Sequence, residues 1–325
     1  MDRSAAPPPD RRDAPAPVVV GVDGSPSADL AVAAAADEAV RRGTRLIVLH
    51  AADPAVYEGG PAPVGYTAAH DVVDRAAAAA RSAERPPRVE TAVVRATPVG
   101  ALLDASRGAA LVVVGARGLG TAHGLLVGSV SRSLAGRASC PVLIVRGNAG
   151  APARFRRRVL VGVSGAAGRP AVELAVEESR LRGMRLLAMH AWTVPAGMRA
   201  RGLARRGIDF AAVARAQARM RLAGVLKGVP PSEDVRIRQD VVRDTAEHAL
   251  VAASYAADLL VIGARRPAGP GPHLGPQLGP VTRAVLGHAQ CPVLVVPLPV
   301  PDRPEPSPRR RAEMPAEARP LRSLR

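Results

Sequence analysis

The strongest constraint on the fold of this chain is an internal repeat. Five short blocks of the first half return, in the same order, in the second half of the 325 residues. The clearest pairs are residues 111–118 (LVVVGARG) with 259–266 (LLVIGARR), and residues 140–145 (CPVLIV) with 291–296 (CPVLVV). Several blocks repeated in one order indicate a duplicated domain, here of roughly 140 residues.

Apolar runs and helical segments alternate within each copy. In the first copy, strands are predicted at residues 18–22, 45–51, 89–96, 111–115 and 142–146, and helices at residues 28–42, 67–85, 99–107 and 129–137. The second copy repeats this order, with its second helix predicted at residues 208–227. Strands that are apolar throughout are buried on both faces, which is typical of a parallel sheet covered by helices. The sequence therefore predicts an α/β fold of two tandem doubly wound domains, each a five-stranded parallel sheet flanked by helices.

The limits of the two domains follow from composition and from the repeat. We predict a first domain at residues 17–147, a linker at 148–157 and a second domain at 158–297. Residues 1–16 are rich in proline, alanine and charge, and residues 298–325 are rich in proline and arginine. Both segments lack the apolar content of a core and are predicted to be disordered tails.

Charge, aromatic content and hydropathy limit the kinds of partner that we expect for this chain. The chain is 47% hydrophobic but only 2% aromatic, and its net charge is +17. The charge permits contact with anionic surfaces, whereas so few aromatic side chains leave little material for stacking on bases and argue against specific nucleic-acid binding. No apolar run reaches the length of a membrane span, and the N-terminus lacks the apolar core of a signal peptide. We therefore expect a cytoplasmic protein without membrane contact.

Cysteine and histidine recur at matching positions of the two copies. Cys140 and Cys291 each precede Pro-Val and a terminal apolar run, which indicates repeated packing residues rather than a disulfide. His50 and His190 end matching apolar runs, and neither has a nucleophile or a metal-ligand spacing beside it, so we interpret both as structural. No carboxylate pair is indicated by the acidic residues on predicted helix or strand faces, which are Glu84, Glu90, Glu177 and Glu178.

A glycine-rich loop follows the apolar run at residues 111–114. Gly115 ends the run, Gly118 and Gly128 lie in the loop, and Ser129 opens a helix-like segment. Glycine lets the backbone approach an anion, and the unpaired amides and dipole of a helix N-terminus favour negative charge. We expect Gly118 to allow a positive φ angle and Ser129 to cap the helix. The stretch is predicted to bind phosphate, although it is not a Walker A motif because Gly-Lys-Ser/Thr is absent.

The spacing of this loop resembles the nucleotide-binding pattern of the universal stress protein family. The pattern is Gly115, two residues, Gly118, nine residues, Gly128 and Ser129. The resemblance covers residues 17–146 and, through the repeat, residues 158–297, which identifies a tandem member. It implies that the phosphates of ATP, bound with Mg²⁺, contact these four residues, and Ser131 is a further candidate.

The resemblance also gives a role to the end of the first strand. With the flavodoxin-like strand order implied by the family, strands one and four are neighbours, so Asp23 lies beside Gly115. The matching aspartate of the family contacts the ribose of the nucleotide. The alternative is a turn, because Asp-Gly-Ser-Pro is a typical turn sequence.

The second copy departs from the nucleotide-binding pattern. Ser164 stands where the first copy has Asp23, Arg266 where it has Gly118, and Pro280 where it has Ser129. The loop is also three residues longer and carries prolines that cannot donate an amide, at Pro267, Pro270, Pro272 and Pro276. We predict that this copy binds ATP poorly or not at all.

Three functions are open at this point. The first is a stress-response switch in which ATP binding to the first domain is read by a protein partner. The second is slow ATP hydrolysis, for which Arg117 is the nearby cation to test. The third is a basic, non-enzymatic scaffold whose Arg-rich tails bind an acidic partner.

The resemblance bears on self-association as well. The terminal strand commonly mediates dimerisation in the family. In a fused chain, residues 142–145 and 292–296 can cover each other's exposed edges as a pseudo-dimer within one chain. A homodimer of the whole chain is the alternative.

Overall fold

A computed structural model describes residues 15–58, 65–118, 127–146, 156–194, 209–230, 234–265 and 278–299. Most of both predicted tails, most of the predicted linker and the middle of each glycine loop lie outside these ranges. Arg266 and the four loop prolines of the second copy are among the residues outside.

Each half contains the predicted alternation of strands and helices. The first half consists of β1 (Val18–Gly21), α1 (Pro26–Arg41), β2 (Leu46–Ala51), α2 (Pro54–Tyr57), α3 (Gly65–Arg81), β3 (Val89–Val94), α4 (Pro98–Ala105), β4 (Leu111–Gly115), α5 (Ser129–Arg137) and β5 (Val142–Val145). The second half consists of β6 (Arg158–Gly162), a short 3-10 helix (Ala166–Gly168), α6 (Arg169–Arg182), β7 (Arg185–Trp192), α8 (Phe210–Lys227), β8 (Ile237–Arg243), α9 (Ala246–Ser254), β9 (Leu259–Arg265), α10 (Pro280–His288) and β10 (Val293–Leu298). The single turn α2 was not expected from the sequence.

Local sequence signals fix where several helices begin. The Ser25 side chain accepts a hydrogen bond from the Ala28 amide at 3.2 Å, and Pro26 opens α1. Thr97 caps α4 in the same way, accepting from the Gly100 amide at 3.2 Å. A side-chain cap followed by proline satisfies one unpaired amide and presets φ for the first helical residue.

The ten strands form one continuous sheet. Its order is β3-β2-β1-β4-β5-β10-β9-β6-β7-β8, and β5 pairs with β10 in antiparallel orientation while all other neighbouring strands in this order are parallel. Within each half the order is therefore 3-2-1-4-5. This differs from the expected flavodoxin order 2-1-3-4-5 and matches the first five strands of the Rossmann order 3-2-1-4-5-6. The expected neighbourhood of strands one and four is confirmed, because Val18 pairs with both Leu46 and Leu111, and it comes from the Rossmann-like order rather than from the flavodoxin order.

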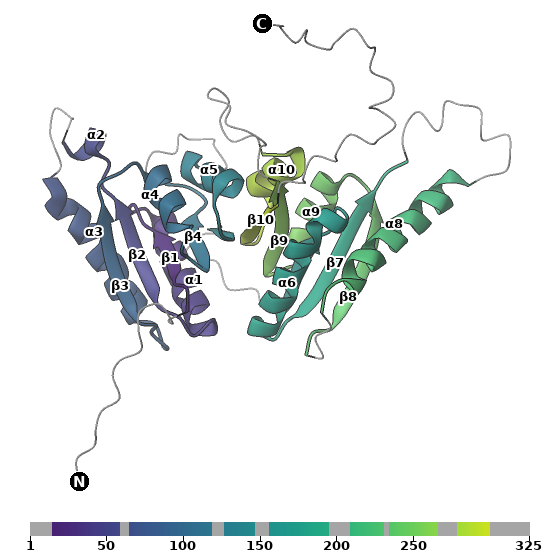
Figure 1. Cartoon of the computed structure of the whole chain (residues 1–325), viewed down its shortest axis with the longest axis horizontal. Coiled ribbons are helices and arrows are strands. Elements are labelled where there is room, and N and C mark those ends of the chain that lie inside the picture. Colours follow the sequence, from purple (N-terminus) through teal and green to yellow (C-terminus); the bar gives the residue numbers. More distant parts are fainter. Residues whose placement is uncertain are drawn as a thin grey trace, which may run out of the picture.

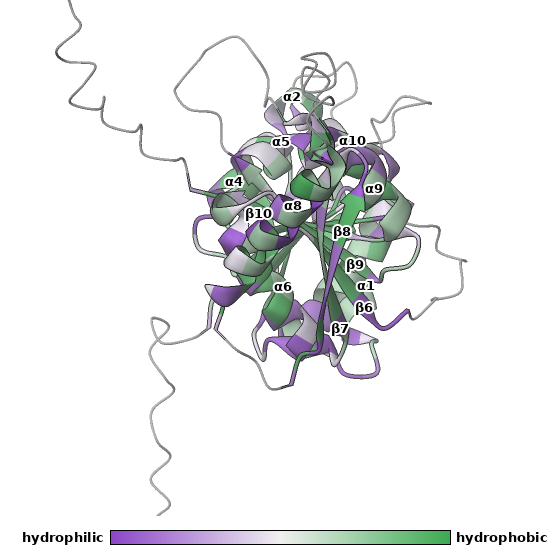
Figure 2. Cartoon of the chain, turned by 90° about the vertical axis from the view of Figure 1, so that its right-hand side faces the viewer, coloured by the Kyte–Doolittle hydropathy of each residue, from purple (hydrophilic) through white to green (hydrophobic). Residues whose placement is uncertain are grey.

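Helices cover both faces of the sheet, as Figure 1 shows. One face carries α1, α3, α6 and α8, and the other carries α4, α5, α9 and α10. Hydrophobic colour concentrates in the central strands and hydrophilic colour on the outer helices and loops (Figure 2). In the part of the chain that the structure describes, every helix is too short or too polar to cross a lipid bilayer.

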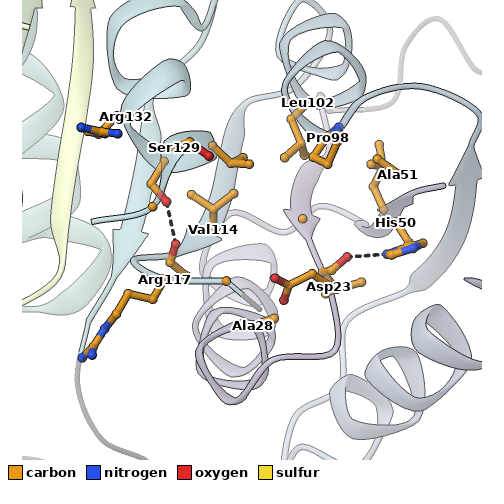
Figure 3. A pocket seen from close by; sticks show the side chains of 18 residues that line it. Asp23, Ala28, His50, Ala51, Pro98, Leu102, Val114, Arg117, Ser129 and Arg132 are labelled. Atoms are coloured by element: carbon orange, nitrogen blue, oxygen red, sulfur yellow. Dashed lines mark hydrogen bonds between the residues drawn. The ribbon is translucent and has the colours of Figure 1, made fainter. Parts of the chain in front are cut away.

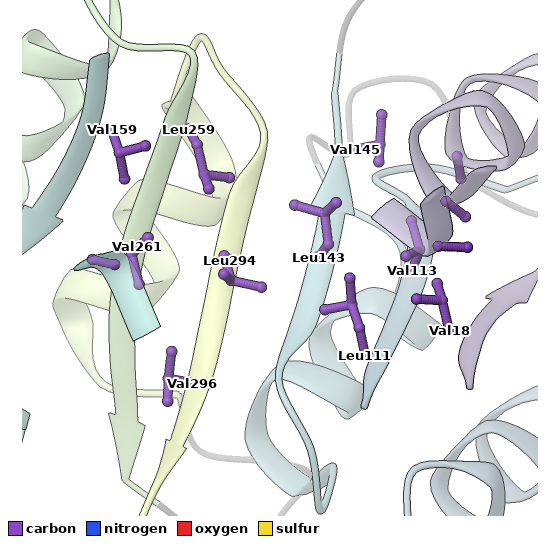
Figure 4. Packing of buried hydrophobic residues seen from close by; sticks show 14 of the residues in the cluster. Val18, Leu111, Val113, Leu143, Val145, Val159, Leu259, Val261, Leu294 and Val296 are labelled. Atoms are coloured by element: carbon purple, nitrogen blue, oxygen red, sulfur yellow. The ribbon is translucent and has the colours of Figure 1, made fainter. Parts of the chain in front are cut away.

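The two halves meet at the seam between β5 and β10. Leu143 pairs with Leu294, and Val142 pairs with Val295. Figure 4 shows the buried aliphatic side chains on the two sides of this seam, and they belong to one cluster that runs through both halves. Each terminal strand thus covers the exposed edge of the other, as the resemblance implied for a fused chain.

A buried ion cluster, which was not predicted from the sequence, also joins the two halves. Glu38 of α1 and Arg42, directly after α1, lie against Glu178 and Arg182 of α6. Each arginine contacts both glutamates, and the glutamate side chains are 3% and 0% exposed. Burial lowers the pKa of Arg182 to about 10, which leaves it charged at neutral pH. We call these four residues the interdomain ion cluster.

Arg146, directly after β5, makes a further contact between the halves. Its guanidinium donates to the carbonyl oxygens of Leu286 and Gly287 near the end of α10, with 2.9 Å to the Gly287 oxygen. A cation at a helix C-terminus pairs with unsatisfied carbonyls and with the helix dipole.

The two cysteines are free and buried, in agreement with the packing role predicted for them. Burial raises the pKa of the Cys140 thiol to about 11 and that of the Cys291 thiol to about 12. We expect iodoacetamide to label neither thiol in the folded chain at pH 8, because the reactive thiolate is absent and access is blocked. Mass spectrometry after alkylation with and without denaturant tests this, and rapid labelling of the folded chain would contradict it.

The raised pKa values of the two thiols also make stability depend on pH. Above about pH 9 the unfolded chain loses thiol protons that the folded chain keeps, so the free energy of unfolding should fall as pH rises.

Candidate functional site

A cavity of about 430 Å³ lies at the C-terminal ends of β1, β2 and β4. In a doubly wound sheet, ligands bind where the strand order reverses, and β1 and β4 flank that point here. Figure 3 shows the side chains that line it. The cavity brings together all six predicted site residues, which are Asp23, Gly115, Gly118, Gly128, Ser129 and Ser131.

The first turn of α5 forms one wall of the cavity. Gly128 is the N-cap residue and Ser129 is the first helical residue, so the prediction that Ser129 caps the helix is wrong. Glycine has no side chain to accept from the first amides, and no side-chain cap bond is present. The amides of the first turn have no intrahelical acceptor, so this wall is suited to an anion.

Gly118 is required for space rather than for a special backbone angle. The described residues with positive φ do not include Gly118, so that expectation is also wrong. A Cβ atom at Gly118 would lie 2.5 Å from Asp23 Oδ2, and one at Gly115 would lie 2.6 Å from the Ser27 carbonyl oxygen. Real Cβ atoms do not approach oxygen so closely, so a larger residue at either position must displace the site.

Asp23 serves the turn and lines the cavity at the same time. Its Oδ1 accepts from the Ser25 amide at 3.0 Å, and Gly24 between them has φ +79°. This Asx turn is the alternative that the sequence left open, and it is present. The turn also fixes the carboxylate at the cavity, since Oδ2 lies on the Gly118 side.

Ser131 joins the end of β4 to α5. Its hydroxyl donates to the Gly115 carbonyl oxygen at 2.8 Å, and the residue is 3% exposed. The hydroxyl proton is therefore committed within the protein. Ser131 holds the strand end and the helix start at a fixed separation.

The sequence did not predict the apolar end of the cavity. Leu49, Pro98, Leu102 and Val114 line it. These residues come from three elements, β2, α4 and β4, and their common position follows only from the strand order.

His50 is structural, as predicted. Its Nδ1 lies 2.7 Å from the Val22 carbonyl oxygen, and its Nε2 lies 2.7 Å from the Tyr57 hydroxyl. Both ring nitrogens are thus engaged. The bond to Val22, drawn dashed in Figure 3, holds the ends of β1 and β2 together.

Two arginines stand at the rim of the cavity. Arg117 and Arg132 both line it, and both are exposed. The Arg117 amide donates to Ser27 Oγ at 3.3 Å, while its guanidinium extends away from Asp23 in Figure 3. The described residues hold no group of three or more His, Cys, Asp or Glu side chains placed to bind a metal.

The equivalent place in the second half is built differently. Strands β9 and β10 stay paired through Ala264–Pro297 and Arg265–Leu298, whereas β4 ends at Gly115. A Cβ atom at Gly263 would lie 2.7 Å from Leu298 Cδ1, so an apolar side chain stands against this glycine. Pro280 is the first residue of α10 and offers no amide.

Comparison with known proteins identifies the family. The model of the universal stress protein family matches residues 16–146 and 156–297. The chain belongs to this family. Universal stress protein Rv2005c of Mycobacterium tuberculosis is 35% identical over 293 residues, covering 86% of this chain and 96% of that protein. Universal stress protein Rv2623 of the same organism is 35% identical over 294 residues, covering 86% and 95%. The chain is thus a tandem universal stress protein.

Solved structures agree on the fold. A universal stress protein from Archaeoglobus fulgidus is 17% identical, with a TM-score of 0.61 over 86% of this chain and 98% of that one. A single-domain universal stress protein solved in complex with cAMP is 38% identical over 41% of this chain and 98% of that one, with a TM-score of 0.31. The Archaeoglobus structure covers nearly the same extent as the curated relatives, so the two-domain architecture is shared.

Proposed function

We propose that the first half of this universal stress protein binds ATP with Mg²⁺ and acts as a stress-response switch. The observation that carries the proposal is the joint placement of Asp23, Gly118 and the uncapped start of α5 in one cavity. An acceptor for sugar hydroxyls and a row of unpaired amides suit the two polar parts of a nucleotide. The apolar end suits a base.

Each part of the site has an assigned role. The carboxylate of Asp23 accepts from the ribose hydroxyls. Gly115 and Gly118 leave room for the phosphates, and Gly128 and Ser129 offer backbone amides and one hydroxyl to them. Ser131 positions Gly115 and does not itself hold phosphate, because its proton is committed.

The described residues are compatible with an Mg²⁺ ion whose ligands come mainly from the nucleotide. Asp23 is the carboxylate among the described residues that line the cavity. Mg²⁺ usually keeps several waters and binds through one or two carboxylates and the phosphates, so a cage of protein ligands is not needed. The ion would neutralise phosphate charge near Asp23.

Switching requires that ATP favours one state of the chain. A nucleotide shifts such an equilibrium only by its difference in affinity between the states. Gly118 and the first turn of α5 contact the phosphates in the proposed complex, and α5 also packs against β10 of the second half. Nucleotide binding can therefore change the packing at the seam, and a protein partner would recognise that change.

Asp23 provides a direct test of the ribose contact. We expect the wild type to bind ATP about tenfold more tightly than 2′,3′-dideoxy-ATP, as for a hydrogen bond to a charged group. In Asp23→Ala the two ligands should bind equally. Titration calorimetry measures both affinities.

Asp53→Ala is the matched control. Asp53 Oδ1 accepts from the Ala55 amide at 3.0 Å, which is the same kind of turn bond, but it does not line the cavity. The control should keep the tenfold preference for the ribose hydroxyls. Equal affinities for both ligands in the wild type would exclude the role given to Asp23.

A further inference from the structure

A second cavity, of about 340 Å³, lies in the second half between the end of β7 and the first turns of α8. These two elements lie side by side near the outer end of the second half (Figure 1). His190 and Trp192 line it from β7, and Phe210, Gln217 and Arg221 line it from α8. It is on the α8 face of the sheet, opposite the face on which α9 and α10 lie.

In the first half, the histidine that matches His190 has an aromatic partner from the protein itself. There Tyr57 bonds to His50 Nε2 at 2.7 Å, and its ring stacks on Tyr66 with 5.8 Å between centroids. In the second half, His190 Nδ1 makes the equivalent bond to the Val163 carbonyl oxygen at 2.6 Å. Among the described residues, no side chain bonds to its Nε2. The duplicated histidine thus keeps its structural bond but loses its aromatic partner.

The indole of Trp192 adds an unsatisfied donor. Its Nε1 is buried and has no hydrogen-bond partner, and it is the one such side-chain atom found among the described residues. A buried donor without an acceptor costs free energy, and such groups are rare in folded proteins. A bound ligand that carries an acceptor removes this cost.

The surroundings select the shape and charge of that ligand. The whole chain has one Trp and two Phe, yet Trp192 and Phe210 line the same cavity. Arg221 lines it too, and the Arg243 guanidinium carbon lies 5.9 Å from the centroid of the Trp192 ring. The described lining residues include no carboxylate, and α8 carries no acidic residue along its length.

We propose that this cavity binds a planar aromatic carboxylate. The ring contacts Trp192 and Phe210, and the carboxylate accepts from Trp192 Nε1 and from Arg221. A cavity of this volume is within the range of small-molecule sites. The site is separate from the proposed nucleotide site and does not depend on it.

The sole tryptophan makes the test simple. We expect benzoate to change the tryptophan fluorescence of the full-length chain saturably, and neutral benzyl alcohol to have at least tenfold lower affinity. Arg221→Gln should weaken benzoate binding about tenfold, since it removes a charged hydrogen bond. Arg219→Gln, also on the exposed side of α8 but outside the cavity, should leave it unchanged.

Trp192→Phe separates the donor from the ring. Calorimetry should show about tenfold weaker benzoate binding to this variant, with its thermal unfolding and circular dichroism close to wild type. The proposal is overturned if benzoate causes no saturable change, if benzyl alcohol binds as tightly, or if Arg219→Gln weakens binding as much as Arg221→Gln.

Discussion

The Gly118→Arg variant is expected to lose ATP binding while remaining folded. A Cβ atom at this position lies 2.5 Å from Asp23 Oδ2, so any side chain must push away the carboxylate proposed to hold the ribose. Overpacking of this kind costs about 1–3 kcal/mol before the guanidinium is placed in the cavity. We expect the affinity for ATP to fall at least about 100-fold, measured by calorimetry.

Gly108→Arg is the matched control for the added charge and bulk. Gly108 is exposed, and a Cβ atom there would meet no other atom within 4 Å. This variant should bind ATP within about twofold of wild type, as surface substitutions usually have small effects. If Gly118→Arg also binds within about threefold of wild type, the assignment of the cavity to ATP is wrong.

The second large effect concerns the interdomain ion cluster. Glu178→Gln removes one of its two negative charges and leaves Glu38 as the one carboxylate of the cluster between the buried Arg42 and Arg182. Breaking a buried ion pair from one side typically costs about 3–5 kcal/mol. We expect a loss of this size in the free energy of unfolding, measured by denaturant titration, with the seam opening first.

The neighbouring glutamate provides the control. Glu177 pairs with Arg180 on the surface, and their side chains are 47% and 49% exposed. Glu177→Gln should change stability by no more than about 0.5 kcal/mol, because exposed pairs are weak. Equal effects of the two substitutions would show that the cluster does not hold the halves together.

Much of the fold was predictable because it depends on local patterns. Apolar runs, turn residues and caps such as Ser25 and Thr97 act over a few residues, so strands and helices appear near their expected positions. The family resemblance, together with the repeat, implied the pairing of the two terminal strands within one chain, and this pairing is present. The strand order was named incorrectly, since alternation of strands and helices is compatible with more than one doubly wound order.

The interdomain ion cluster could not be predicted for a physical reason. Glutamate and arginine four residues apart, as in Glu38 with Arg42 and Glu178 with Arg182, are typical of an exposed helix face. Only the packing of α1 against α6 across the seam turns them into buried partners, and Arg42 and Glu178 are 136 residues apart.

In the candidate site, too, some features follow from the local sequence and others depend on tertiary contacts. The residue types and spacing predicted which residues would meet at the cavity, because they follow from the ends of strands one and four. The roles of single residues depend on atomic neighbours. The need for glycine at position 118 follows from the nearby Asp23 carboxylate, and Gly128 rather than Ser129 is the N-cap residue of α5. The Ser131 hydroxyl donates its proton to the Gly115 carbonyl oxygen.

The most direct test of the central proposal is the stoichiometry of ATP binding. Calorimetric titration of the full-length chain with ATP and Mg²⁺ should give one site per chain, because the second half lacks the carboxylate of Asp23 and has Pro280 at the start of α10. Two sites per chain would show that the second half also binds ATP despite these changes. No binding by the folded chain would contradict the nucleotide switch altogether.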